Sequence, residues 1–257
     1  MQALFARAVA GMPEAVVYVV DGDAEVRRLL RHGLAAVRMR AAFYPSAEAF
    51  LESCEPGGPG CLALELALPG MSGLELQALL REQDSPLSLL VMSSFGDAET
   101  AVRVLKAGAS DYVTKPFSTQ MLLQRIREAN AESRRRCERQ RIREEAVALV
   151  DRLTRREKDV LLGLLGGQGS KQIAASLKVS ERTVETRRRR IREKTGFDSL
   201  ADLALLRCFA GQESCPYVAR CGRHALCTRF FDGDMAGAED LAPRFRAPKP
   251  TPARFAG

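Results

Sequence analysis

The chain has 257 residues, of which 46% are apolar and 28% are charged, and its formal net charge is +7. No uninterrupted apolar run approaches the roughly 20 residues that cross a bilayer, and the first residues make a poor secretory signal, so a membrane-spanning or secreted protein is not expected. We expect a cytoplasmic protein of two domains, because one domain typically has about 100 to 150 residues.

Charge is divided unevenly along the chain. Residues 14–129 hold 11 Lys and Arg against 15 Asp and Glu, whereas residues 151–200 hold 13 against seven. Positive charge is therefore concentrated in one segment that could bind a polyanion. A solvated basic surface is the plainer alternative, since charge alone does not identify a nucleic-acid-binding protein.

Residues 15–130 alternate short apolar runs with amphipathic stretches, which is typical of strand–helix units that form a parallel sheet. The runs predicted as strands are Val16–Val20, Arg40–Tyr44, Cys61–Leu66, Leu87–Met92 and Asp111–Val113. The stretches predicted as helices are Glu25–Val37, Ala47–Ser53, Leu74–Arg81 and Glu99–Ala107. In the first helix, the residues predicted to share one face are Val26, Leu29, Leu30, Gly33 and Leu34. The predicted fold of this part is α/β, a doubly wound parallel sheet of five strands with helices on both faces.

A long helix is predicted from near Ser118 to Val150, because no Gly or Pro interrupts this stretch. Its middle is rich in Arg and has only Cys137 and Ile142 as apolar anchors, too few for a coiled-coil seam. We therefore expect residues 131–150 to form a solvated linker with weak dimer contacts.

Residues 151–210 predict an all-α, helix-turn-helix domain. The residues predicted to cap its first three helices are Thr154 with Glu157 as a capping box, then Ser170, then Ser180. The third helix, Glu181–Lys194, carries four consecutive Arg. A short turn between two helices, the second of them basic, is the geometry that places a helix in the major groove of DNA.

Function in an open parallel sheet resides where the strands end. The residues found there are Asp21 and Asp23 after the first strand, Glu65 at the end of the third, Ser93 after the fourth and Lys115 after the fifth. We expect these acids, this hydroxyl and this amine to lie close together.

The same residues, with Leu-Pro-Gly-Met-Ser-Gly after the third strand, Lys-Ala-Gly-Ala before the fifth and Lys-Pro-Phe after it, resemble the receiver domain of response regulators. The resemblance implies that an Asp at the third strand end accepts a phosphoryl group with Mg²⁺ on an acidic pair and a neutralising Lys. In this chain the phosphoacceptor position is Glu65, and the second acidic position is Gly22. The resemblance assigns the hydroxyl to Ser93, the amine to Lys115 and the aromatic switch to Tyr112.

A Glu carboxylate extends one methylene further than Asp, so neither Mg²⁺ binding nor phosphoryl transfer is expected. Our first hypothesis is that Glu65 is a partial mimic of a phosphoryl group and reaches toward Lys115 and Ser93. One alternative is an inert acid in a receiver that serves only as a dimerisation scaffold. Another is a genuine phosphoacceptor in a receiver that dephosphorylates itself.

The motifs Leu-Thr-Arg-Arg-Glu, Lys-Gln-Ile-Ala and Ser-Glu-Arg-Thr-Val-Glu-Thr resemble the LuxR-type DNA-binding domain of NarL/FixJ response regulators. Val184 and Ile191, seven residues apart, are predicted to face the core. The residues predicted on the opposite face of the third helix are Arg182, Glu185, Thr186, Arg189 and Arg192. The resemblance implies base contacts by Glu185, Thr186 and Arg189. It implies phosphate contacts by Lys171, Ser180, Arg182 and Thr183.

Four cysteines and a histidine near the end of the chain are candidate metal ligands, namely Cys208, Cys215, Cys221, Cys227 and His224. Thiolates in this number could hold Zn²⁺ or an iron–sulfur cluster, with the fourth ligand open between Cys208 and His224. A thiol redox switch and inert cysteines are the alternatives. A metal- or redox-sensing transcription factor is therefore a second hypothesis for the whole chain.

The predicted segments are a 1–14 N-terminal extension, a 15–130 receiver, a 131–150 helical linker, a 151–210 helix-turn-helix domain and a 211–257 tail. We predict a transcription regulator of the two-component type that is not an enzyme. Its expected partners are double-stranded DNA and a second copy of itself, with a sensor kinase and RNA polymerase as further candidates and no membrane. A protein that binds partners without specific DNA contact is the rival interpretation.

Overall fold

The computed structural model describes residues 2–53, 57–94 and 96–210, and the structural statements below concern these residues. Contacts divide the chain into two units. Among the described residues, 10–140 form one unit, and 2–9 together with 141–210 form the other. None of the helices in the described parts combines the length and the apolar character that a membrane crossing requires.

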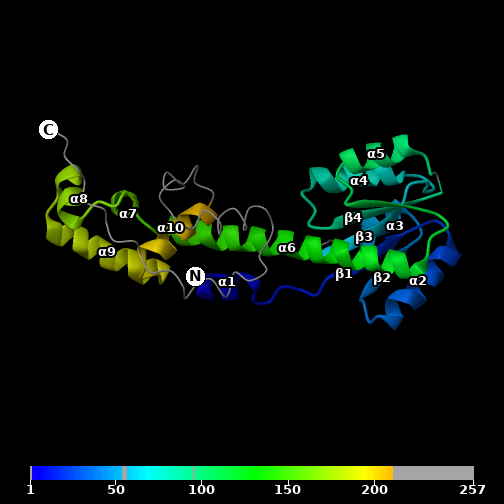
Figure 1. The fold of residues 1–257 in the computed structure, drawn as a ribbon, viewed down its shortest axis with the longest axis horizontal. Coiled ribbons are helices and arrows are strands. Elements are labelled where there is room, and N and C mark those ends of the chain that lie inside the picture. Colours follow the sequence, from blue (N-terminus) through cyan, green and yellow to red (C-terminus); the bar gives the residue numbers. More distant parts are fainter. Residues whose placement is uncertain (1, 54–56, 95, 211–257) are drawn as a thin grey trace, which may run out of the picture. The chain divides into compact units, whose positions relative to one another are not determined.

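The unit of residues 10–140 is built on a five-stranded parallel sheet with the strand order β2-β1-β3-β4-β5 (Figure 1). The strands are β1 Val16–Val20, β2 Ala41–Tyr44, β3 Gly60–Glu65, β4 Ser88–Ser93 and β5 Asp111–Thr114. Every residue of β3 and β4 is buried, because parallel strands in the middle of a sheet are covered on both faces. The predicted α/β class is confirmed, and the strand boundaries differ from the predicted ones by at most one residue.

Two layers of helices cover this sheet. The helices between the strands are α2 Ala24–Ala36, α3 Ala47–Ser53, α4 Gly73–Glu82 and α5 Ala98–Lys106. One buried cluster joins the sheet to α3, α4 and α5 through Phe50, Leu76 and Val104. The other joins it to α2 and to the start of α6 (Thr119–Asp151) through Leu34 and Ile126.

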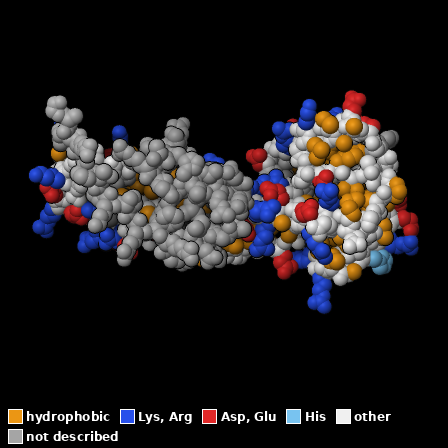
Figure 2. Space-filling model, viewed as in Figure 1, with side chains coloured by type: hydrophobic (Ala, Val, Ile, Leu, Met, Phe, Trp, Pro, Cys, Tyr) orange, Lys and Arg blue, Asp and Glu red, His pale blue; other side chains and the backbone are white. Residues whose placement is uncertain are grey.

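The predicted buried face of α2 is wrong at Leu29, which is 47% exposed. Leu30 and Leu34 are fully buried, and the buried stripe is centred on this pair because residues four apart share a helix face. On the opposite layer, Val102 and Leu105 of α5 are exposed, and apolar side chains gather over this helix in Figure 2.

Residues 131–150 lie within α6, but parts of this stretch are buried and not solvated as predicted. Ser133 is buried, where its hydroxyl accepts from the Gly60 N–H at 2.9 Å and donates to the Pro86 carbonyl at 2.5 Å. Further along α6, Ile142 is 1% exposed. Sequence patterning missed this burial because the groups that cover these side chains lie far away in the chain.

The partner of the second half of α6 is the N-terminal helix α1, Gln2–Val9. Leu4 and Ala8 are buried in one cluster with Ile142 and Ala146, and Arg7 pairs with Glu145 at 3.2 Å. Spacing of four residues places the two buried side chains of α1 on one face. The segment predicted only as an N-terminal extension therefore contributes to the core of the second unit.

The second unit continues with α7 Arg155–Leu165, α8 Ser170–Leu177, α9 Glu181–Thr195 and α10 Leu200–Phe209. The predicted capping box at Thr154 and Glu157 is present. Ser180 caps α9, and Gly196 ends it with a φ of 73°. The predicted cap at Ser170 is wrong, because Gly169 is the N-cap of α8 and its N–H donates to the Gln172 side chain at 2.9 Å. Ser170 is instead the first helical residue, which leaves its hydroxyl available for another partner.

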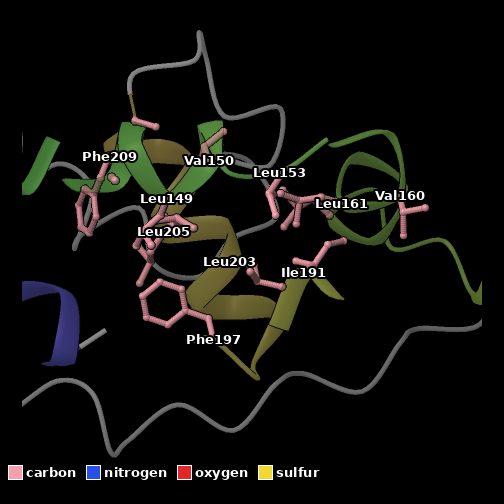
Figure 3. Close-up of a cluster of buried hydrophobic side chains, with 14 of the residues drawn as sticks. Leu149, Val150, Leu153, Val160, Leu161, Ile191, Phe197, Leu203, Leu205 and Phe209 are labelled. Carbon is pink, nitrogen blue, oxygen red and sulfur yellow. The ribbon is translucent and has the colours of Figure 1, made fainter. Parts of the chain in front are cut away.

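One apolar core holds these helices together (Figure 3). Among its labelled members are Leu149, Leu153, Val160, Leu161, Ile191, Phe197, Leu203, Leu205 and Phe209, which come from α6, α7, α9, α10 and the connections beside them. Val184 and Ile191 are buried as predicted, at 0% and 1% exposed. The opposite face of α9 is therefore left on the surface.

Candidate functional site

The carboxyl edge of the sheet brings an acid, an amine and a second acid together. Asp21 follows β1, Glu65 ends β3 and Lys115 follows β5, as their positions in the chain predict. Ser93 ends the neighbouring β4 and is fully buried. Asp21 is 1% exposed and Glu65 is 4% exposed, so both carboxylates need partners inside the protein.

Lys115 supplies the partner for both acids. Its ammonium donates to Oδ2 of Asp21 at 2.7 Å and pairs with Oε2 of Glu65. The other carboxylate oxygens accept hydrogen bonds from the backbone. Oδ1 of Asp21 accepts from the Asp23 N–H at 2.9 Å, and Oε1 of Glu65 accepts from the Ala67 N–H at 3.1 Å. All four carboxylate oxygens therefore have donors.

Burial lowers the pKa of Lys115, but its hydrogen bonds and charge attraction to Asp21 and Glu65 outweigh that effect and raise the pKa above its usual value. The side chain of Lys115 is 16% exposed, so it stays charged in a largely enclosed place. The pocket thus holds one cation between two acids, and Glu65 reaches Lys115 as predicted.

Asp23 does not join this group. Its side chain accepts from the Glu25 N–H at 2.8 Å and is the N-cap of α2. Tyr112, predicted as the aromatic switch, lies half-buried on β5 and packs against the apolar cluster on the α5 side. The structure therefore brings Asp21, Glu65 and Lys115 together and uses Asp23 as a helix cap.

The residues of this pocket do not fit Mg²⁺ in the arrangement they adopt. Mg²⁺ needs near-octahedral oxygen ligands, usually one or two carboxylates with several waters. Here the oxygens of Asp21 and Glu65 are taken by N–H donors, and an ammonium lies between the two acids. In the described residues, no group of three His, Cys, Asp or Glu side chains could hold a metal ion.

The second group of predicted site residues lies on and beside α9. Arg182, Glu185, Arg189 and Arg192 are exposed on this helix, and Lys171 is exposed at the start of α8. The remaining predicted residues make local bonds: the Thr183 N–H donates to the Ser180 hydroxyl at 3.1 Å, and the Thr186 hydroxyl donates to the Arg182 carbonyl at 2.8 Å. The structure brings these eight predicted residues to one helix and the element before it.

Two of the arginines of α9 are tied to nearby acids. Arg189 lies 3.5 Å from Glu193, and Arg192 lies 2.7 Å from Asp198. All four side chains are more than half exposed, and exposed pairs of this kind contribute only about 0 to 1 kcal/mol each. The pairs are therefore weak enough to open when a polyanion competes for the arginines.

Sequence reasoning missed a cluster around Glu185. Ser170 donates its hydroxyl to Oε1 of Glu185, and Nη1 of Arg188 donates to the same oxygen at 3.0 Å and to the Ser170 hydroxyl at 3.1 Å. The hydrogen bond from Ser170, with the charges of Arg188 and Arg192, lowers the pKa of Glu185. The spacing of Glu185 and Arg188 could have suggested their pairing, but the Ser170 contact depends on the turn between α8 and α9.

An ion pair between a partly exposed lysine and a buried acid anchors α9 to α7. Lys194 donates to Oε2 of Glu157 at 2.7 Å, and Glu157 is 3% exposed. Burial raises the pKa of Glu157, but Lys194 and the bonds with Thr154 outweigh it and lower the pKa overall. Thr195 is buried with its hydroxyl donating to the Ile191 carbonyl at 2.8 Å, so its polar group is satisfied.

Of the candidate metal ligands, only Cys208 belongs to the described residues. It lies half-buried in the last turn of α10. The other candidates, Cys215, Cys221, Cys227 and His224, lie outside the described residues.

Known protein families match both units. The response regulator receiver domain matches residues 17–127, and the luxR family of bacterial regulatory proteins matches residues 151–207. The chain is 33% identical to the transcriptional regulatory protein TdiR of Thauera aromatica over 82% of its own length and 91% of that protein. It is 32% identical to the transcriptional regulatory protein FixJ of Bradyrhizobium diazoefficiens over 76% of its length and 95% of that protein. A low-resolution structure of the response regulator StyR is similar, with a TM-score of 0.71 and 35% identity over 76% of this chain and 98% of that one.

Proposed function

The chain belongs to the two-component response regulators that join a receiver domain to a LuxR-type DNA-binding domain, and from this premise we propose that its receiver acts without phosphorylation. Its relatives are transcriptional regulators, and this chain is a DNA-binding regulator rather than an enzyme. What remains to be proposed is how its receiver is controlled and how its DNA-binding unit works.

The observation that carries the proposal is the position of Lys115 between Glu65 and Asp21. The Glu65 side chain is one methylene longer than Asp, which displaces the oxygen that would attack phosphorus, and its two oxygens accept from the Ala67 N–H and from Lys115. Lys115, which would neutralise an incoming phosphoryl group, already faces two carboxylates. The pocket therefore supports a permanent internal anion at Glu65 in place of a transferred phosphoryl group.

Intact mass measurement tests the first part of this proposal. The full chain is incubated with acetyl phosphate and Mg²⁺, and its mass is compared with that of the Glu65→Gln variant treated in the same way. We expect neither protein to gain a phosphoryl group. A stoichiometric gain by the wild type that Glu65→Gln lacks would identify Glu65 as a genuine phosphoacceptor and refute the proposal.

DNA binding by the same variant separates the mimic from an inert scaffold. Gln has the size of Glu but no charge, so Glu65→Gln removes the anion at Lys115 and leaves Asp21 in place. If Glu65 substitutes for a phosphoryl group, the variant binds DNA more weakly than the wild type at the same salt concentration. Equal affinities would favour a receiver that serves only as a dimerisation scaffold.

In the second unit, we propose that α9 enters the major groove as the recognition helix of a homodimer that binds two half-sites of double-stranded DNA. Arg189 would contact base edges and Lys171 phosphates, and the exposed Val102 and Leu105 of α5 would supply apolar surface to the dimer. Competition between a selected duplex and random duplex at fixed salt tests sequence-specific binding, which a protein without specific DNA contact would not show.

Such a regulator would work in the cytoplasm and act on RNA polymerase, and a sensor kinase that bound it would transfer no phosphoryl group.

A Zn²⁺ or iron–sulfur site at the C-terminal cysteines stays a prediction. Metal and sulfide content of protein purified without oxygen tests it, with Cys215→Ser as the control variant.

A further inference from the structure

Glu185 is an acid on the exposed side of the most basic helix of the chain. Arg182 and the four arginines of residues 187–190 share α9 with it, and its side chain is 56% exposed. A carboxylate in such a place repels phosphate groups and so weakens binding to any polyanion. Its cluster with Ser170 and Arg188 indicates what it contributes in return.

The hydrogen bonds of this cluster are made to one carboxylate oxygen of Glu185 and not to the other. Ser170 and Arg188 both donate to Oε1. Within the described residues, no group donates to Oε2. Arg188 also donates to the Ser170 hydroxyl at 3.1 Å, so the three side chains form a closed ring of hydrogen bonds that spans α8 and α9. A helix-surface pair of Glu185 and Arg188 alone would not need Ser170, which comes from the preceding helix.

The charge state of Glu185 restricts what its second oxygen can contact. Its pKa is lowered, first by the Ser170 hydrogen bond, so the group is ionised and can only accept hydrogen bonds. In the major groove, the base-edge donors are the amino groups of cytosine and adenine. Adenine presents the acceptor N7 beside its amino group, which repels a carboxylate, whereas cytosine does not.

We propose that Oε2 of Glu185 accepts from the amino group of a cytosine in each half-site, and that Ser170 and Arg188 are positioning residues that hold Glu185 for this contact. The inference rests on the proposed function, in which α9 lies in the major groove. The inference adds to that function a preference for one base and names two residues, Ser170 and Arg188, on which the preference depends. Ser170 is not the N-cap of α8, so its hydroxyl can be removed without uncapping that helix.

Selection from a randomised duplex library tests the proposal. The full-length wild type and the variants Glu185→Gln, Ser170→Ala and Arg188→Gln are each bound to the library at one salt concentration, and the base preference at every position is read by sequencing. Arg190→Gln is the matched control, because it removes the same charge from an exposed position of the same helix. Thermal unfolding of each variant verifies that it is folded.

The wild type is expected to select cytosine at one position of each half-site. Glu185→Gln should abolish that selection. Ser170→Ala and Arg188→Gln should each weaken it by about threefold at the same position, because Glu185 is kept but is held less firmly. Arg190→Gln should lower affinity for all sequences alike, as loss of a phosphate contact does.

Three results would overturn the inference. If Glu185→Gln leaves every base preference unchanged, Glu185 reads no base. If it removes the cytosine preference while Ser170→Ala and Arg188→Gln behave like Arg190→Gln, the two residues do not position Glu185. If the wild type itself selects no sequence over random duplex, the proposed DNA-binding function fails together with the inference.

Discussion

Replacement of Lys115 by Met should destabilise the receiver. The change removes the only ammonium between Asp21 and Glu65 in the described residues, and the side chains of these acids are 1% and 6% exposed. Removing one partner of a buried ion pair costs about 3 to 5 kcal/mol, because it leaves charge buried without compensation. We therefore expect Lys115→Met to lose about 3 to 5 kcal/mol of stability at about pH 7, because Asp21 and Glu65 are left without the cation that they share.

Urea unfolding at about pH 7 measures this loss, followed by far-ultraviolet circular dichroism because the chain has no Trp. The double variant Lys115→Met with Glu65→Gln is the control, since it leaves one buried carboxylate and should recover part of the stability. An unfolding midpoint of Lys115→Met equal to that of the wild type would refute the reasoning.

Three further predictions concern the second unit. Leu4→Ala should cost about 2 to 5 kcal/mol of its stability, because Leu4 is 1% exposed in the core of α1 and α6; an unchanged unfolding temperature would show that α1 does not pack there. The lowered pKa of Glu157 stabilises this unit above the ordinary carboxyl pKa, and this contribution is lost as the pH falls through the lowered folded value. Glu157→Gln should flatten the acid limb of its stability profile, and an unaltered limb would contradict the pairing with Lys194. Arg189→Ala should cost about 1 to 3 kcal/mol of DNA-binding free energy and relax one base preference. Lys171→Ala should weaken binding to all sequences alike and reduce the slope of log affinity against log salt concentration by about 1. Equal losses of affinity on selected and random duplex for both variants would contradict these roles.

The fold of the receiver was largely predictable, since buried parallel strands are short apolar runs and their helices begin with clear caps. The sequence-based predictions of the fold are wrong where two neighbouring residues can each cap a helix, or where the residue that a side chain packs against is distant in the chain. Gly169 and Ser170 are both acceptable N-caps, and the pattern alone does not choose between them. The spacing of Leu4 and Ala8 suggests a helix face, but nothing local shows that this face packs against Ile142.

The candidate sites also contain contacts that the sequence predicts and contacts that it does not. Convergence of strand ends predicted the contact between Glu65 and Lys115, because every parallel strand ends at the same edge of the sheet. Asp23 was expected in that pocket, but an Asp just before a helix is also a strong N-cap, and the local bond to the Glu25 N–H determines its position. The Ser170 contact with Glu185 arises only once α8 and α9 are packed, so no local pattern predicts it.

DNA affinity with and without a phosphodonor tests the central claim most directly. The full-length chain is titrated with a selected duplex at fixed salt, once untreated and once after incubation with acetyl phosphate and Mg²⁺. Because Glu65 and Asp21 already enclose Lys115, the account predicts the same affinity in both titrations. A higher affinity after treatment, accompanied by the gain of one phosphoryl group, would contradict it and show that the receiver is switched by phosphorylation.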